Sequence, residues 1–110
     1  MSLWSDYYAE RFNYETIEED WGFLSYSIIK PYLAIQECYI IPEARKSHKA
    51  IELFNRAVRV AELEECTHLW TQVQVNDRGA TRALRANLAL GFSVISADNG
   101  RIIMTRATGG

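Results

Sequence analysis

One long amphipathic segment, Ser47 to Glu65, lies directly between two runs of strand-like sequence. The apolar positions of this segment recur at helical spacing and are Ala50, Leu53, Phe54, Ala57, Val58, Ala61 and Leu63. The apolar run Tyr32–Ile41, which ends at Pro42, precedes it, and the run Thr67–Val75, which alternates from Leu69 on, follows it. A strand, a helix and a strand in this order predict a crossover that makes the two strands parallel neighbours in one sheet.

The residues before this unit predict two further strands and a short helix. Tyr14–Glu18 alternates in polarity, and Phe23–Ile29 is rich in the aromatic and β-branched residues that favour strands. The tripeptide Asp20–Gly22 supplies a turn between them. Trp4, Tyr8 and Phe12 share one helical face, so we expect an amphipathic helix over Ser2–Phe12 that packs on the body of the domain.

A second helix is predicted after the run Thr67–Val75. Asn76 or Asp77 can cap its amino end, and the helical pattern continues to about Leu90. Gly91 then stands where a left-handed residue commonly ends a helix, and Phe92 can fold back on the last turn.

The last structured region is predicted to be a β-hairpin. Ser93–Ala97 and Arg101–Arg106 flank Asp98-Asn99-Gly100, and Asn-Gly between two β runs is a strong signal for a tight turn. The expected order is α-β-β-β-α-β-α-β-β in a single domain over residues 1–110. In that domain residues 1–12 form a helix, 13–106 the core and 107–110 a loose tail.

Composition excludes several classes of protein. The chain has 110 residues, of which 48% are hydrophobic, and a formal net charge of −2, so it can bury a core and lacks the excess cation of a broad nucleic-acid surface. We find no apolar run long enough for a membrane span and no signal peptide, and therefore expect a soluble, cytoplasmic protein. Cys38 and Cys66 are expected to be reduced structural thiols. With the separated His48 and His68 they form no metal-ligand pattern, so we expect no metal.

Three motifs in this order resemble the GNAT acetyltransferase family. The run Tyr39-Ile40-Ile41-Pro42-Glu43-Ala44-Arg45 resembles the family's strand-ending V-x-P-E-x-R, and the long helix after it resembles the coenzyme-binding helix. The stretch from Ala83-Leu84 to Gly91-Phe92 is similar to the family's closing helix and its terminal Gly-Phe. The resemblance implies an α/β (α+β) fold with a mixed, mostly antiparallel sheet, helices on both faces and a shortened N-terminal portion.

The resemblance also implies a site for acetyl-coenzyme A. The family's phosphate-binding signature R/Q-x-x-G-x-G/A aligns with Arg45-Lys46-Ser47-His48-Lys49-Ala50, in which His48 replaces the first glycine. Backbone N–H groups and the positive end of the helix dipole would hold the coenzyme pyrophosphate there. The pantetheine arm would pair with strand backbone in Cys38–Ile41, which includes Ile40, and in Thr71–Val75, with Asn76 as a further donor.

For catalysis, the resemblance implies an acyl-coenzyme A-dependent N-acyltransferase that acts on an amine of a small molecule or protein. Glu37 occupies a position comparable to the family's glutamate base, and a solvent-facing strand residue is its alternative interpretation. The family's usual acid, a tyrosine four residues before Gly-Phe, is replaced by Asn87. His48 is expected to be a surface residue rather than a base.

The second hypothesis is a protein without catalytic activity. Under it, the chain is a catalytically degenerate GNAT-like binding or assembly protein that forms a homo-oligomer or binds another protein. Short, glycine-poor sequences with this helix start resemble bacteriophage sequences, which would fit a virion component or an inhibitor of host defence. His48 and Asn87 favour this second hypothesis, whereas Arg45 and Ala50 favour the enzyme.

Overall fold

The computed structural model describes residues 14–45 and 47–109. Its elements are β1 (Glu15–Glu19), β2 (Gly22–Ile29), β3 (Tyr32–Ile40), the 3-10 turn η1 (Pro42–Ala44), α2 (Lys49–Leu63), β4 (His68–Gln74), α3 (Ala80–Ala89), β5 (Ser93–Asp98) and β6 (Arg101–Ala107). This order confirms the strands and helices predicted for this part of the chain. The helix predicted at Ser2–Phe12 lies outside the described residues. No helix in the described ranges is long and apolar enough to span a membrane.

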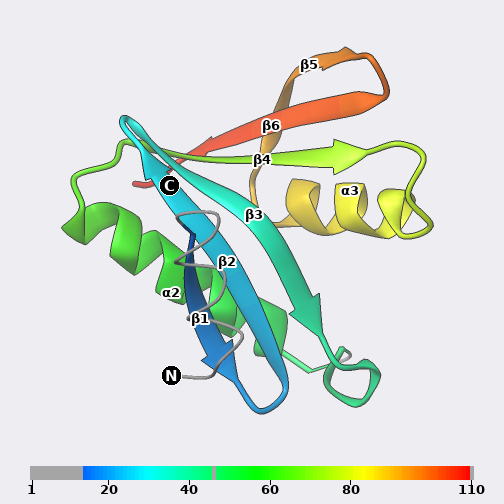
Figure 1. Ribbon diagram of the computed structural model, residues 1–110, viewed down its shortest axis with the longest axis horizontal. Coiled ribbons are helices and arrows are strands. Elements are labelled where there is room, and N and C mark those ends of the chain that lie inside the picture. The colour runs from blue at the N-terminus through cyan, green and yellow to red at the C-terminus, as the bar shows by residue number, and fades with distance from the viewer. Residues whose placement is uncertain (1–13, 46, 110) are drawn as a thin grey trace.

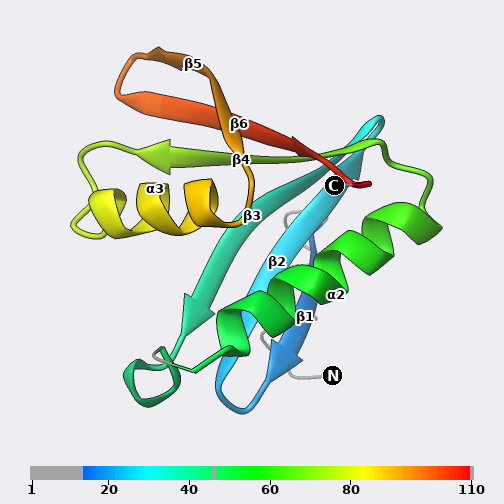
Figure 2. The same ribbon diagram turned by 180° about the vertical axis from the view of Figure 1, so that it is seen from behind.

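The six strands form one sheet in the order β1-β2-β3-β4-β6-β5 (Figure 1). Strands β3 and β4 pair in parallel, and every other neighbouring pair is antiparallel. Helix α2 connects the two parallel strands and crosses over β1 and β2 (Figure 2). This arrangement confirms the crossover unit and the mixed, mostly antiparallel sheet.

The core lies between the sheet and the helices. Leu33 of β3, Leu53 of α2, Leu69 of β4 and Met104 of β6 have no exposed surface. Leu84 of α3 packs against the same cluster, so both described helices cover one face of the sheet. The burial of these large aliphatic side chains supplies the main driving force for folding.

Helix α3 begins later than predicted. We expected Asn76 or Asp77 as its cap, but Gly79 is the capping residue and the helix starts at Ala80. The Asp77 N–H donates to the Gln74 carbonyl at 3.1 Å, and the Ala80 N–H donates to the Asp77 carbonyl at 3.1 Å. These two turns use the residues that would otherwise form the first helical turn. Helix α2 is also shorter than predicted, by two residues at each end.

The carboxyl end of α3 has the predicted geometry. Gly91 has a φ of +96°. Its N–H donates to the Leu88 carbonyl at 3.1 Å, and the Phe92 N–H donates to the Asn87 carbonyl at 3.0 Å. This pair of bonds is the Schellman motif, which requires a left-handed residue. Phe92 is thereby folded back onto the core, where its ring contacts Phe54 at a centroid distance of 5.7 Å.

The hairpin prediction is also confirmed, because Asn99 and Gly100 both have positive φ angles between β5 and β6. The structured part of the chain extends further than predicted at this end. Strand β6 includes Ala107, and the N–H of Thr108 donates to the Thr67 carbonyl at 2.9 Å. The first two residues of the expected tail are therefore held by backbone hydrogen bonds.

Candidate functional site

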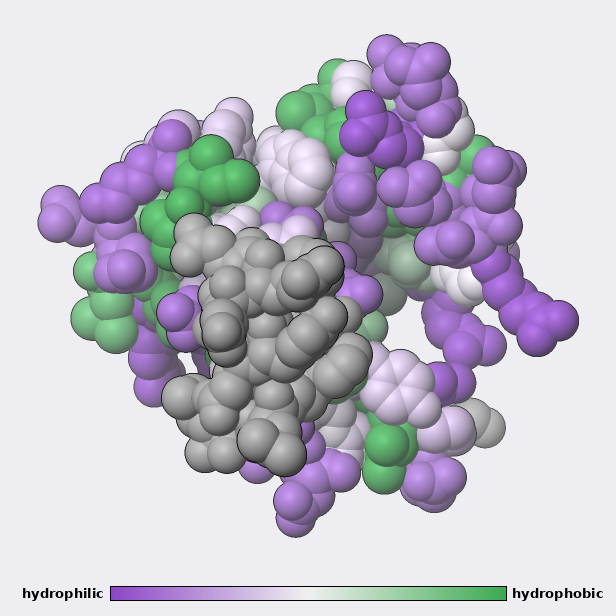
Figure 3. Space-filling view, in the orientation of Figure 1, coloured by the Kyte–Doolittle hydropathy of each residue, from purple (hydrophilic) through white to green (hydrophobic). Residues whose placement is uncertain are grey.

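The two parallel strands separate soon after they begin. Their ladder consists of three residue pairs, Tyr32–His68, Leu33–Leu69 and Ala34–Trp70. Beyond Ala34 and Trp70 the strands diverge toward their carboxyl ends (Figure 1). The space-filling view is hollowed between the end of β3 and the side of the molecule that carries α3 (Figure 3). Past Ala34 and Trp70, the facing edges of β3 and β4 no longer pair with each other. Their backbone groups can therefore pair with an extended ligand.

A β-bulge in β3 accompanies this divergence. Ile35 and Glu37 pair with consecutive residues of β2, so Gln36 is the extra residue. The Gln36 Nε2 donates to the Ser27 Oγ at 3.0 Å, which fixes the bulged side chain on the neighbouring strand. A bulge bends its strand and increases the local twist. Because it follows Ala34 directly, this bulge accounts for the turn of β3 away from β4.

The start of α2 lies just past the carboxyl end of β3. His48 is its capping residue, with a φ of −83°, and its side chain makes no capping hydrogen bond. The N–H groups of the first helical turn have no intrahelical acceptor and carry the positive end of the helix dipole. Since the backbone at His48 has negative φ and the side chain is exposed, a histidine is accommodated where the family signature has glycine.

Two cations are held beside this helix start. The Arg45 Nε donates to the Ile40 carbonyl at 2.9 Å, and its guanidinium carbon lies 5.6 Å from the centroid of the Tyr39 ring. The Lys49 Nζ lies 4.9 Å from the centroid of the Trp21 ring. The Arg45 bond uses Nε, so its terminal nitrogens keep their donors for an anion.

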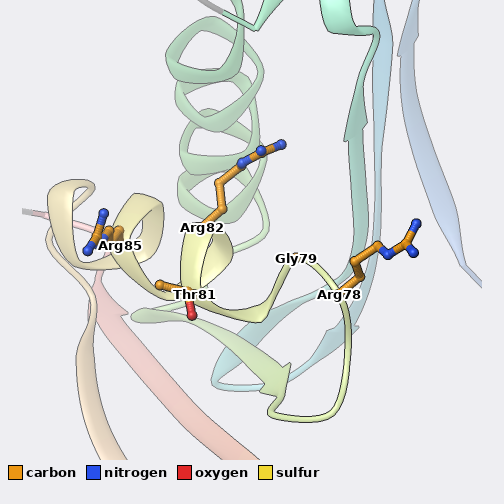
Figure 4. Close-up of a pocket in the computed structure, with 5 residues that line it drawn as sticks. All are labelled: Arg78, Gly79, Thr81, Arg82 and Arg85. Carbon is orange, nitrogen blue, oxygen red and sulfur yellow. The ribbon is translucent and has the colours of Figure 1, made fainter.

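A second cationic group lies at the start of α3, past the carboxyl end of β4. Arg78, Gly79, Thr81, Arg82 and Arg85 line an open hollow of about 570 Å³ (Figure 4). In Figure 4, Arg82 extends from α3 toward the space between α2 and β3. Hydrophilic side chains gather on this side of the molecule (Figure 3). Our sequence reasoning missed this group, although three arginines within eight residues, Arg78, Arg82 and Arg85, mark it in the sequence. In Figure 4 the three side chains point in different directions.

The predicted site residues fall into two sets. Ile40 is buried at the end of β3, Ile41 follows it, and Ser47, His48 and Ala50 are exposed around the start of α2. Together with Arg45 and Lys49 they form one continuous region. Lys46 lies outside the described residues.

The remaining candidates lie elsewhere. Glu37 is exposed and directly follows the bulge, on the diverging part of β3. Asn76 lies beside the β5–β6 turn, since its Nδ2 is 3.9 Å from the position of a Cβ built on Gly100. Asn87 is partly exposed on α3, and its carbonyl accepts the Phe92 N–H.

The two thiols differ in exposure. Cys38 is exposed at its place in β3, and desolvation by the surrounding protein raises the pKa of its thiol to about 11. Burial also raises the pKa of the Cys66 thiol. Both cysteines are free, as predicted. In residues 14–45 and 47–109, no group of three or more His, Cys, Asp or Glu side chains could hold a metal ion.

No protein-family model matches the chain, and no curated protein sequence matches it. Solved structures do match. A protein assigned to the GNAT acetyltransferase family from Desulfovibrio desulfuricans superposes with a TM-score of 0.79 at 17% identity, over 94% of this chain and 75% of that one. The ribosomal-protein-S18-alanine N-acetyltransferase from Escherichia coli gives a TM-score of 0.70 at 14% identity, over 98% and 77%.

The PaiA N-acetyltransferase from Thermoplasma acidophilum, solved in complex with coenzyme A, gives a TM-score of 0.71 at 20% identity. The match covers 79% of this chain, which spans only 53% of the PaiA chain. The three comparisons confirm the predicted fold, which is that of the GNAT acetyltransferases. They give no support to a bacteriophage origin.

Proposed function

We propose that this chain is a GNAT-superfamily protein that binds an acyl-coenzyme A between β3 and β4 and transfers its acyl group to an amine. The observation that carries the proposal is the early end of the β3–β4 ladder, which places the uncapped start of α2 beside the opening. Ligands of open sheets with parallel strands bind at the carboxyl ends of those strands. A coenzyme A complex of the same fold supports the choice of ligand.

The residues at the start of α2 fit a pyrophosphate. The uncapped N–H groups of the first turn, from Lys49 and Ala50 on, can each donate to a phosphate oxygen. Arg45 adds a charged donor held in place by Ile40 and Tyr39. We propose that Lys46, Ser47 and the exposed His48 complete this region.

The pantetheine arm would lie along the opening. Its amides can pair with the backbone of β3 near Ile40 and Ile41 and with the edge of β4 from Thr71 to Val75. We retain Asn76 as a proposed contact for the end of this arm. Its place beside the β5–β6 turn requires the arm to reach past the carboxyl end of β4.

Acyl transfer forms a C–N bond and breaks the thioester C–S bond. The amine loses a proton as it attacks, and the departing thiolate gains one. Glu37 is the proposed acceptor of the amine proton, because it lies on β3 next to the bulge and is open to solvent. Asn87 cannot donate a proton at neutral pH, so we assign protonation of the thiolate to water.

A second candidate is a protein that binds the coenzyme but does not turn it over. Asn87, at the position that resembles the family's acid, favours this candidate. Release of free thiol from acetyl-coenzyme A in the presence of a panel of amines separates the two. An amine-dependent release that Glu37→Gln abolishes supports transfer, whereas binding without release supports the second candidate.

Acetyl-coenzyme A is expected to stabilise the fold. At about 100 times its dissociation constant, a ligand adds roughly 2.7 kcal/mol to the free energy of unfolding. For a domain of this size that corresponds to a rise in the melting temperature on the order of 10 °C. Thermal unfolding with acetyl-coenzyme A, coenzyme A and ATP measures the effect, and we expect ATP to leave the melting temperature unchanged.

Arg45→Ala should remove most of this stabilisation, because it deletes the charged donor at the start of α2. Arg59→Ala is the matched control, since Arg59 is exposed on the same helix but far along it from the site. If neither form of coenzyme A raises the melting temperature of the unmodified protein, the proposal is wrong.

A further inference from the structure

Helix α3 is less covered than α2. None of the ten residues of α3 is buried, whereas α2 buries four residues, which are Leu53, Phe54, Ala57 and Ala61. A partly buried side chain, Leu84, packs α3 against the core. A helix that only covers a core has its apolar side against that core and its polar side in water. Helix α3 departs from this pattern, because Leu88 near its carboxyl end is 51% exposed.

The same segment carries a local excess of positive charge. Residues 76–89 contain three arginines and one acidic residue, Asp77, in a chain whose formal net charge is −2. Arg78, Arg82 and Arg85 are exposed, and none of them forms an ion pair within the described part of the chain. Like charges that lie close together repel one another, so an anionic partner would stabilise this segment.

The directions of the three arginine side chains decide which kind of anion fits. Figure 4 shows them pointing in different directions around an open hollow of about 570 Å³. Guanidiniums that diverge cannot converge on one small anion, whereas carboxylates on separate side chains of a polypeptide can each pair with one arginine. A Cβ built on Gly79, at the centre of this segment, has no atom within 4 Å, so there is room for a polypeptide to cross here.

A nucleic acid fits this surface less well. The described residues that line the hollow are Arg78, Gly79, Thr81, Arg82 and Arg85, and none of these five is aromatic, so they offer no ring for a base to stack on. The negative net charge of the chain weakens the long-range attraction of a polyanion. The exposed Leu88, one turn past Arg85, adds an apolar contact near the cations, and arginines beside apolar contacts are typical of protein–protein interfaces.

We propose that the α3 surface, formed by Arg78, Arg82, Arg85 and Leu88, binds an acidic segment of a partner protein. Separate Asp or Glu side chains of that segment pair with separate arginines, and an apolar side chain next to them covers Leu88. This inference does not depend on the proposed function, because none of the four residues belongs to the proposed coenzyme site.

Fluorescence anisotropy of a short labelled peptide, titrated with the whole chain, tests the proposal. The peptide contains several Glu residues and one Leu, and its two controls are the same peptide with Gln in place of each Glu and a single-stranded oligouridylate of equal charge. We expect the acidic peptide to bind, and its affinity to fall as the NaCl concentration rises, because salt screens exposed charges.

The double variant Arg82→Ala/Arg85→Ala should bind the acidic peptide at least about tenfold more weakly, since truncation of arginines that anchor an interface has effects of this size. Arg59→Ala is the matched control, because Arg59 is exposed on α2, and it should bind as the unmodified protein does. Both arginines of the double variant are exposed, so its melting temperature should be unchanged.

Four results would overturn the proposal. They are no binding of the acidic peptide by the unmodified protein, equal binding of its Gln counterpart, unchanged binding by the double variant, and tighter binding of the oligouridylate than of the peptide. The last result would assign the α3 surface to a nucleic acid. None of the four involves coenzyme A, so the proposed function stands or falls separately.

Discussion

Replacing Leu53 with alanine is expected to lower the free energy of unfolding by about 2–5 kcal/mol. Leu53 has no exposed surface, and it lies on the face of α2 that packs against the sheet. The substitution removes buried apolar surface and leaves a cavity that the packed surroundings fill only in part. Urea unfolding monitored by circular dichroism measures the loss.

Leu63→Ala is the matched control for this experiment. Leu63 ends the same helix but is 78% exposed, so its truncation should change the free energy of unfolding by less than about 0.5 kcal/mol. Equal effects of the two substitutions would contradict the placement of the core beneath the middle of α2.

The second large effect is expected from Gly22→Ala, at about 3 kcal/mol of lost stability. Gly22 begins β2 and faces the end of β3. A Cβ at this position would lie 2.4 Å from the Tyr39 carbonyl oxygen and 2.8 Å from the Ile40 Cδ1. The nearer atom belongs to the backbone, so relief requires the end of β3 to move. Because the Ile40 carbonyl accepts the Arg45 Nε–H, the same shift should weaken coenzyme binding.

Gly109→Ala is the control for Gly22→Ala, because a Cβ on Gly109 has no atom within 4 Å. We expect its melting temperature and its affinity for coenzyme A to match those of the unmodified protein. A Gly22→Ala variant as stable as this control would contradict the close approach of β2 and β3 at this point.

The features that the sequence predicted correctly are those determined by residues close to one another along the chain. The amphipathic pattern of α2 and the two flanking runs were sufficient for the crossover, and Gly91 and Asn99-Gly100 specified a helix end and a hairpin turn through their backbone preferences. The start of α3 was misjudged because Asp77 can either cap a helix or close a turn, and the structure uses it in two turns. Local sequence does not decide between these outcomes.

The candidate site was predictable only on the α2 side. There a continuous run from Arg45 to Ala50 resembles a known signature. The bulge at Gln36 depends on the pairing of β3 with β2, and neither glycine nor proline marks it in the sequence. The arginines near the start of α3 belong to no motif in the sequence, and only the fold shows that they line a hollow past the carboxyl end of β4.

We propose that coenzyme A lies between β3 and β4 with its phosphates at the start of α2. Amide chemical shifts of the 15N-labelled protein, followed by NMR during titration with coenzyme A, locate the bound ligand residue by residue. We expect the largest changes at the first turn of α2, residues 48–51, and along the diverging strand edges, residues 35–41 and 71–75. Changes confined to the β5–β6 hairpin or to the outer strand β1, or no changes at all, would contradict it.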